Sequence, residues 1–491
     1  MTTLPPRTPV LVGIAQVEQR ERDPLAAKEP LELMTLATKL AAEDAGSREL
    51  LARADAVRVI RGVWPYADPA RAVAQRVGAA SAKSAITPYG GNFVQTALNK
   101  TALEIQAGGV DIAILTGAEC GYTQARARKQ GVKLAWSEAP GTPDVQIGVD
   151  VPMSHDAERK AGVKQPVQMY PVFENALRKA RGETLPEHIE RVSKLWAGFS
   201  AVASRNPHAW IREAKSAQEI RTPGPDNRMV SFPYPKLMNS NNNVDQGAAL
   251  ILTSLETAQR LGIAREKWVF PWAGTDAHDF YYVSERDNLC SSPAIRFAGR
   301  RALELAGVSV SDLAHVDVYS CFPVAVQVAA REIGLDEAKP LTVTGGLTFG
   351  GGPLNNYVMH GVARMAEVLR ADRGKVGLCT ANGGFLTKHA MVVYSTEPPA
   401  RPFRHEDVQP LVDATPRREV LLDHAGEATI EGYTVDFSGE TPAIGHAALL
   451  TSEGKRAWAN SVDRDVALAM TREEFCGKRV RVKDGAFEVL D

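Results

Sequence analysis

Between Pro9 and about Gly117, short apolar runs alternate with longer amphipathic stretches. VLVGIA, VRVIRGVW and VDIAILTG have strand length, while LELMTLATKLAAEDAG and FVQTALNKTALEIQAGG have the apolar spacing of helices that bury one face. Apolar runs without polar interruption indicate strands that are covered on both faces. The pattern therefore predicts an α/β fold built on a mostly parallel, buried sheet.

The same rhythm returns after about Ser240. Strands are predicted at GAALILTS, WVFPWAG, AHVDVYS, KVGLCTAN and HAMVVYST, with helices at SSPAIRFAGRRALELAG, FPVAVQVAAREIG and NNYVMHGVARMAEVLR. Both blocks end with a long amphipathic helix, a glycine, a buried strand and a turn of small residues: ALEIQAGGVDIAILTGAE and MAEVLRADRGKVGLCTANGG. This parallel predicts a duplicated α/β unit.

The segment between the two blocks breaks the rhythm, because helix-like pieces lie there among Pro- and Asp-rich turns. From Gly121 to Ser240 it carries 18 Lys and Arg residues against 12 Asp and Glu residues, although the whole chain has a net charge of -1. We interpret it as an inserted helical lid. Its positive charge fits either an ordinary solvated surface or a surface for a polyanionic ligand.

The composition shifts again after Ser395. EPPARPFRHEDVQP is rich in proline and predicts a linker, and the runs beyond it alternate with the period of strands around turns such as EGK and KDG. The tail therefore predicts a small β barrel of about 80 residues.

The composition excludes several classes of protein. With a net charge of -1, no global basic field draws the chain to nucleic acid or to anionic lipid. Its five cysteines are scattered without CxxC spacing, which argues against a disulfide framework or a cysteine zinc site and favours a reducing, cytoplasmic location. No stretch approaches the roughly 18 apolar residues of a membrane span.

No specific catalytic signature is present, but four turns are candidates for chemistry. GxSxG, HExxH and GxxxxGK[ST] are absent. The candidates are the glycine pair that opens a helix in TPYGGNFVQTALNK, the strand-to-helix turn YSCFP, the glycine-rich run TGGLTFGGGP and the polar turn TANGGF. Taken singly, each also fits a structural role: a helix start, an inert buried thiol at Cys321, or a tight turn.

Together, in this order, the four turns resemble the thiolase superfamily of acyl-CoA acyltransferases over roughly residues 8 to 396. ALNKTALEIQAGGVDIAILTGAE and SNNNVDQGAALILTSLETAQRLG are similar to the family's first half. VDVYSCFPVAVQVAAREIGL resembles the Asn-Glu-Ala-Phe motif, and more closely the His-Asp-Cys-Phe version of the sterol-carrier-protein thiolase branch, whose loop domain the lid also resembles. The resemblance implies a thiolase fold of two similar α/β halves with an inserted helical loop domain.

The resemblance also implies where the family's reacting side chains fall in this sequence. The nucleophilic cysteine falls at Gly91, the activating histidine at Gly352 and the second cysteine at Asn382, so all three are replaced. The Asn-Glu-Ala-Phe motif falls on four residues: Tyr319, Ser320, Cys321 and Phe322. We therefore expect ordinary thiolase turnover to be absent.

Three functions remain open. We expect a thiolase-like protein that binds CoA or an acyl-CoA and is grouped with acetyl-CoA acetyltransferases. The alternatives are an enzyme of altered thioester chemistry centred on Cys321, such as a hydrolase or a condensing enzyme, and a scaffold that binds a partner protein through its C-terminal barrel. The basic lid residues that we assign to the CoA phosphates are Arg126, Arg128, Lys129 and Lys133.

The expected organisation follows from these boundaries. Residues 1–120 and 241–265 form the first half, 121–240 the lid, 266–398 the second half, 399–416 a linker and 417–491 a barrel similar to oligonucleotide/oligosaccharide-binding (OB) folds. We expect no prosthetic group, no metal, no nucleic acid and no membrane. The ligand is a CoA thioester of lipid metabolism, and the protein is either a monomer or a homodimer.

Overall fold

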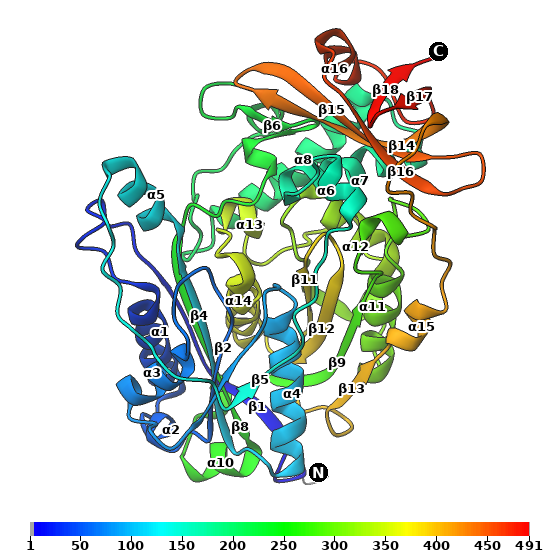
Figure 1. Ribbon diagram of the computed structural model, residues 1–491. Coiled ribbons are helices and arrows are strands. Elements are labelled where there is room, and N and C mark those ends of the chain that lie inside the picture. The colour runs from blue at the N-terminus through cyan, green and yellow to red at the C-terminus, as the bar shows by residue number, and fades with distance from the viewer. Residues whose placement is uncertain (1–3, 491) are drawn as a thin grey trace.

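The apolar runs of the first block form a six-stranded sheet in the computed structural model, which describes residues 4–490 (Figure 1). Its order is β1-β8-β4-β2-β3-β5, and β4 and β8 are buried along their whole length. The strands are β1 (Pro9–Glu18), β2 (Ala56–Val59), β3 (Lys83–Ile86), β4 (Ile112–Cys120), β5 (Val145–Gln146) and β8 (Asp245–Ser254).

The second block forms a five-stranded sheet of order β10-β11-β12-β9-β13. Its strands are β9 (Phe270–His278), β10 (Leu313–Asp317), β11 (Val376–Gly383), β12 (Lys388–Ser395) and β13 (Arg404–Asp407). Because β11 continues to Gly383, our prediction of a turn over the whole of TANGGF is wrong. Its first residues pair with β12, and Gly383 lies opposite Lys388.

The two sheets repeat one topology. In the first, β2 pairs in parallel with β4, β4 pairs antiparallel with β8, and β8 pairs antiparallel with β1. In the second, β10, β11, β12 and β9 are joined in the same sequence of parallel and antiparallel pairs. The predicted pair of similar α/β halves is therefore confirmed.

Two helices lie between the sheets, and most of the other helices of the two halves cover the outer faces (Figure 1). The inner helices are α4 (Phe93–Ala107) and α14 (Tyr357–Ala371). The others are α1 (Pro30–Ala45), α2 (Glu49–Ala52), α3 (Pro69–Val77), α10 (Leu255–Arg260), α11 (Pro293–Ala306), α12 (Pro323–Ile333), α13 (Gly346–Phe349) and α15 (Gln409–Asp413), with 3-10 turns at Arg265–Lys267, Val283–Glu285, Val310–Asp312 and Leu354–Asn356. The turns before α4 and α12 lie together with the end of β11.

The regular elements of the lid between β4 and β8 are mostly helices. Its longest helix, α8, starts at a capping box in which Thr184 and Glu187 satisfy each other's backbone N–H groups. The elements are α5 (Gly121–Gln130), α6 (Asp156–Lys160), α7 (Pro166–Arg181), α8 (Leu185–Ala203), α9 (Ala217–Arg221), β6 (Met229–Ser231), β7 (Tyr234–Pro235) and a 3-10 turn at Lys236–Met238. The strand β5 also belongs to this insertion and pairs with the outer edge of β3.

The C-terminal domain is rich in strands, as predicted. Its elements are β14 (Gly426–Ser438), β15 (Thr441–Leu450), β16 (Arg456–Ser461), α16 (Arg464–Met470), β17 (Arg479–Lys483) and β18 (Ala486–Val489). Since β14 pairs with both β15 and β17, these strands close into a ring. The lid strand β6 also pairs with β14, so the sheet joins the tail to the lid.

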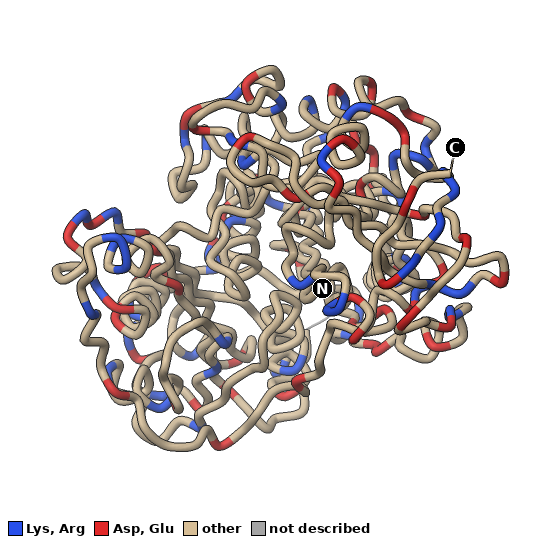
Figure 2. Tube along the Cα trace, turned by 45° about the horizontal axis from the view of Figure 1, so that its top comes forward, with Lys and Arg blue, Asp and Glu red and all other residues tan. Residues whose placement is uncertain are grey.

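Charged residues of both signs are interspersed along the whole chain, as Figure 2 shows. None of the helices within residues 4–490 is long and apolar enough to cross a membrane.

Candidate functional site

The glycine pair before α4 is packed too closely to accept a side chain at its second position. Gly90 has a φ of +151°, and Asn92 occupies the N-cap position of α4 without a capping hydrogen bond from its side chain. A Cβ atom built on Gly91 would lie 2.5 Å from the carbonyl oxygen of Asn382 and 3.0 Å from the hydroxyl oxygen of Tyr319. Real Cβ atoms essentially never approach backbone that closely, so no nucleophilic side chain fits at position 91 without a backbone shift.

Tyr319 lies at the turn between β10 and α12. Its backbone N–H donates to Thr380 Oγ1 at 2.9 Å, and its ring meets that of Tyr357 edge to face, with centroids 5.5 Å apart. Burial raises the pKa of the Tyr319 phenol well above its usual value. The phenol is therefore neutral at ordinary pH and able to donate a hydrogen bond toward the space beside Gly91.

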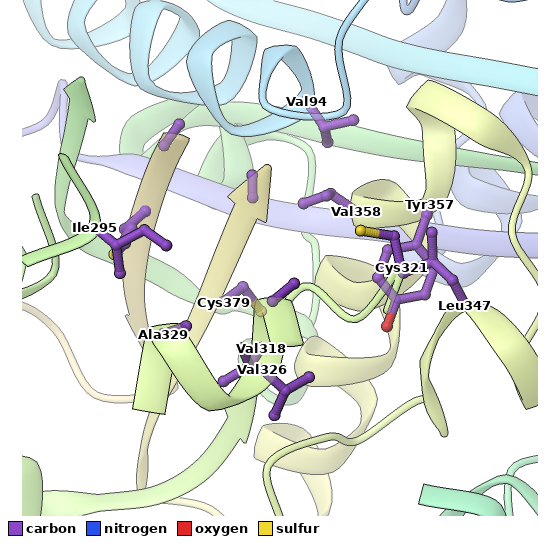
Figure 3. Close-up of a cluster of buried hydrophobic side chains, with 14 of the residues drawn as sticks. Val94, Ile295, Val318, Cys321, Val326, Ala329, Leu347, Tyr357, Val358 and Cys379 are labelled. Atoms are coloured by element: carbon purple, nitrogen blue, oxygen red, sulfur yellow. The ribbon is translucent and has the colours of Figure 1, made fainter. Parts of the chain in front are cut away.

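Cys321 lies in a cluster of buried apolar side chains that includes Val94 of α4 and Val358 of α14 (Figure 3). Its Sγ is 3.8 Å from Asn382 Nδ2, and burial raises the pKa of the thiol to about 12. The ring of Phe322, the next residue, stacks on the lid residue Tyr170 with centroids 4.4 Å apart. Cys321 is thus a protonated thiol enclosed by aromatic and aliphatic side chains.

Asn382 is the next-to-last residue of β11, and its side chain is hydrogen-bonded to a lid tyrosine. Asn382 Nδ2 donates to the hydroxyl oxygen of Tyr170 at 2.9 Å. That hydroxyl donates to the carbonyl oxygen of Gly384 and accepts from the N–H of Leu386, both at 2.9 Å. Asn382 Oδ1 is buried and has no hydrogen-bond partner within the described residues.

The structure brings Gly91, Tyr319, Cys321 and Asn382 together, whereas Gly352 faces a different segment. The three heavy atoms nearest to a Cβ built on Gly352 all belong to residues 240–242, with Ser240 Oγ at 2.5 Å. The Gly352 N–H also donates to the Asn241 carbonyl at 2.9 Å. A histidine at this position would displace the end of the lid.

The basic lid residues lie on and just after α5. Arg126 donates to the Arg22 carbonyl at 2.7 Å and lies over the Tyr122 ring. Arg128 and Lys133 line a hollow of about 800 Å³, and Lys129 is exposed. The same hollow is lined by Trp136, Val63, Pro65 and Gln124, among others. Two of the four predicted phosphate ligands therefore share one concave surface with an aromatic ring.

Lys388 is a site residue that sequence reasoning missed. Its side chain is 5% exposed, its Nζ donates to the Tyr89 carbonyl at 2.7 Å, and it lies 5.0 Å from the centre of the Phe93 ring. Burial lowers the pKa of this ammonium group. The only signal in the sequence was a lysine at the start of an apolar strand. Tyr170 was equally hidden, because its helix lies over two hundred residues before the loop that it contacts.

Within residues 4–490, no cluster of three or more His, Cys, Asp and Glu side chains is arranged to bind a metal ion.

Comparisons with known proteins support the fold and the added C-terminal domain. Residues 407–486 match the family model described as the thiolase-like protein type 1 additional C-terminal domain. A crystal structure of a monomeric SCP2-thiolase like protein type 1 from Mycobacterium smegmatis is 29% identical over 99% of this chain and 100% of that chain, with a TM-score of 0.85. No curated protein sequence matches the chain.

More distant solved structures share the fold alone. An acetyl-CoA acetyltransferase from Syntrophomonas wolfei is 16% identical over 80% of this chain and 99% of that chain, with a TM-score of 0.57. The dimeric peroxisomal thiolase of Saccharomyces cerevisiae is 14% identical over 80% of this chain and 99% of that chain, also with a TM-score of 0.57.

The paired sheets, the inner helices and the turns at their end define a protein of the thiolase fold with an added strand-rich domain. The chain is similar to an SCP2-thiolase like protein type 1 along nearly its whole length, and its residues 407–486 match the additional C-terminal domain described for thiolase-like protein type 1.

Proposed function

We propose that this protein binds CoA or an acyl-CoA and does not turn over 3-ketoacyl-CoA by the Cys/His/Cys route. The observation that carries the proposal is the distance of 2.5 Å between the Asn382 carbonyl oxygen and a Cβ position on Gly91. A thiolase needs a cysteine side chain there to accept the acyl group. Beside Gly91, Tyr319 and Asn382 offer a ligand hydrogen bonds in place of a nucleophile.

We place the nucleotide part of CoA in the hollow beside α5. Arg128 and Lys133 supply positive charge for its phosphates, and Trp136 supplies a ring for its base. The hollow is linked to the start of α4 by short contacts, because Gln124 donates to the Val63 carbonyl and Tyr89 donates to the Gly62 carbonyl. A thioester arm running past residues 62–63 would reach the exposed ring of Tyr89.

The second candidate function is thioester chemistry at Cys321. It is favoured by the closeness of the thiol to Asn382 and Tyr170. It is opposed by the pKa of about 12, because the reactive form is the thiolate. A scaffold that binds a partner protein through the C-terminal domain is the non-enzymatic alternative.

Three measurements separate these functions. Calorimetry with CoA measures binding, a spectrophotometric assay with acetoacetyl-CoA measures turnover, and intact mass after incubation with acetyl-CoA detects an acyl adduct. Binding without turnover or adduct supports our proposal. Turnover that is lost in Cys321→Ala but kept in the control Cys290→Ala supports the second function, and neither binding nor turnover supports the scaffold.

We also propose that the protein is a monomer that acts in the cytoplasm on acyl thioesters of lipid metabolism. The similar protein from Mycobacterium smegmatis is described as monomeric. In this chain β5 pairs with β3, so the chain itself covers the outer edge of the first sheet, where a second subunit would add its own strand. Light scattering coupled to size exclusion measures the mass directly, and a dimer would contradict the proposal.

A further inference from the structure

One arginine of the C-terminal domain reaches into the second α/β half. The Arg456 side chain is fully buried and forms a bidentate pair with Glu431, with both N···O distances at 2.8 Å. Its remaining donors point to backbone carbonyl oxygens of residues 283–287, including Ser284 at 2.9 Å and Arg286. A buried guanidinium needs a partner for every N–H, so this segment is held by the charge of Arg456.

Further contacts fix the same segment from two sides. Trp458 Nε1 donates to Ser284 Oγ at 2.8 Å. The Ser284 hydroxyl and N–H both donate to Glu158 of the lid helix α6, at 2.6 and 2.8 Å. The segment 283–287 is therefore hydrogen-bonded both to the C-terminal domain and to the lid.

The segment in turn holds the loop that follows Asn382. Arg286, also buried, donates from Nη2 to the Phe385 carbonyl at 2.8 Å and to Thr387 Oγ1 at 2.9 Å. In the same loop Leu386 has a φ of +53°, a conformation that costs a leucine about 1 kcal/mol or more and persists only where its surroundings hold it. Arg286 and Tyr170 supply the hydrogen bonds that hold it.

From this chain of contacts we infer that the C-terminal domain braces the candidate site, with Arg456 as a positioning residue that acts through Arg286 on the loop 384–387. The inference does not depend on which ligand the site takes. It assigns the added domain the role of holding the loop 384–387 in place, and not the role of a separate binding module.

The test is hydrogen exchange measured on the intact protein. Removing Arg456 alone would leave Glu431 buried without a partner, so the variant is the double substitution Arg456→Met with Glu431→Gln. The matched control is Arg178→Met with Glu474→Gln. In this second arginine–glutamate pair Arg178 is buried and Glu474 is partly exposed; it joins the same domain to the lid helix α7, with both distances at 2.8 Å, and does not contact residues 283–287.

We expect exchange of the Leu386 and Thr387 amides to accelerate about tenfold or more in the Arg456 variant and to stay at the wild-type rate in the control. Arg286→Met should accelerate the same amides while the C-terminal domain keeps its protection. Unchanged exchange of these amides in the Arg456 variant, or equal acceleration in the control, overturns the inference.

A milder variant keeps the test decisive if the double substitution does not fold. Trp458→Phe removes one hydrogen bond to Ser284 and keeps an aromatic ring in place. It should accelerate the same two amides about threefold, as expected for the loss of one neutral hydrogen bond. Acceleration confined to the C-terminal domain would again overturn the inference.

Discussion

The carbonyl oxygen of Asn382 lies 2.5 Å from the point that a Cβ atom on Gly91 would occupy. Gly91→Ala should therefore lower the free energy of unfolding by about 1–3 kcal/mol, because backbone on both sides must move. Urea denaturation measures the change. The control is Gly198→Ala in α8, where a Cβ meets no atom within 4 Å and alanine should raise stability by about 0.5–1 kcal/mol. Equal urea midpoints for Gly91→Ala and the wild type would show that position 91 has room.

Restoring the family's residues should not restore a good thiolase. In the triple variant Gly91→Cys, Gly352→His and Asn382→Cys, the new cysteine at 91 lies against the backbone carbonyl of residue 382, and the new histidine lies against residues 240–242. The change at 382 also removes the side-chain amide that donates a hydrogen bond to the Tyr170 hydroxyl. Reacting groups need positions accurate to about 0.5 Å. Acetoacetyl-CoA turnover should be slow at most.

Tyr319 adds a second obstacle to the restored site. Its phenol occupies space beside Gly91, where the family's smaller side chain helps to stabilise the acyl oxygen, and loss of one such donor costs roughly 3 kcal/mol. Adding Tyr319→Asn or Tyr319→His to the triple variant should therefore raise the rate. Family-typical turnover by the triple variant alone would contradict our description of the site.

CoA binding should weaken as ionic strength rises, because the proposed contacts are between basic side chains and phosphates. Charge reversal at Arg128 or Lys133 should weaken it further, whereas Lys483→Glu on the exposed face of β17 should change it little. Reversals at Arg126 and Lys129 test the other two predicted ligands. Calorimetry at two salt concentrations is the measurement. Binding that is independent of salt, or no binding at millimolar CoA, would remove the lid from the ligand site.

Acid should destabilise the lid, because it protonates the Glu183 carboxylate. Burial raises the pKa of this carboxyl, but hydrogen bonds from Arg191 and His188 outweigh burial and lower the pKa to about 2. A depressed folded-state pKa contributes stability that is present above the unfolded value near 4.5 and is lost as the pH falls toward 2. Glu183→Gln should be less stable than the wild type at pH 7 and should lose less stability over that window.

Thermal unfolding between pH 7 and pH 2 measures this difference. The control is Glu440→Gln in the exposed turn between β14 and β15, which should follow the wild-type pH dependence. Parallel curves for Glu183→Gln and the wild type would contradict the prediction.

The local sequence pattern was enough to predict the two halves, because buried strands and helices that bury one face each give a characteristic spacing of apolar residues. It also located the turns that carry Gly91, Cys321 and Asn382, since loops at the ends of parallel strands gather at one edge. Contacts between segments that are distant in the chain produce no such pattern in the sequence. Tyr170 and Asn382 meet across 212 residues, and Arg456 and Ser284 across 172. The first residues of TANGGF lie in β11 because they pair with β12, and the composition of the segment does not reveal this pairing.

The pairing of β6 with β14 has a consequence for the order of events during synthesis. Ser231 donates to Asp436, which follows it by 205 residues. At 5–20 residues per second, the ribosome needs about 10 to 40 s to make the strand that completes this part of the lid. For that time the nascent lid exposes an apolar surface and an unpaired strand edge. Chains that end before β14 should therefore be bound by chaperones or aggregate, even though both α/β halves have already been synthesised.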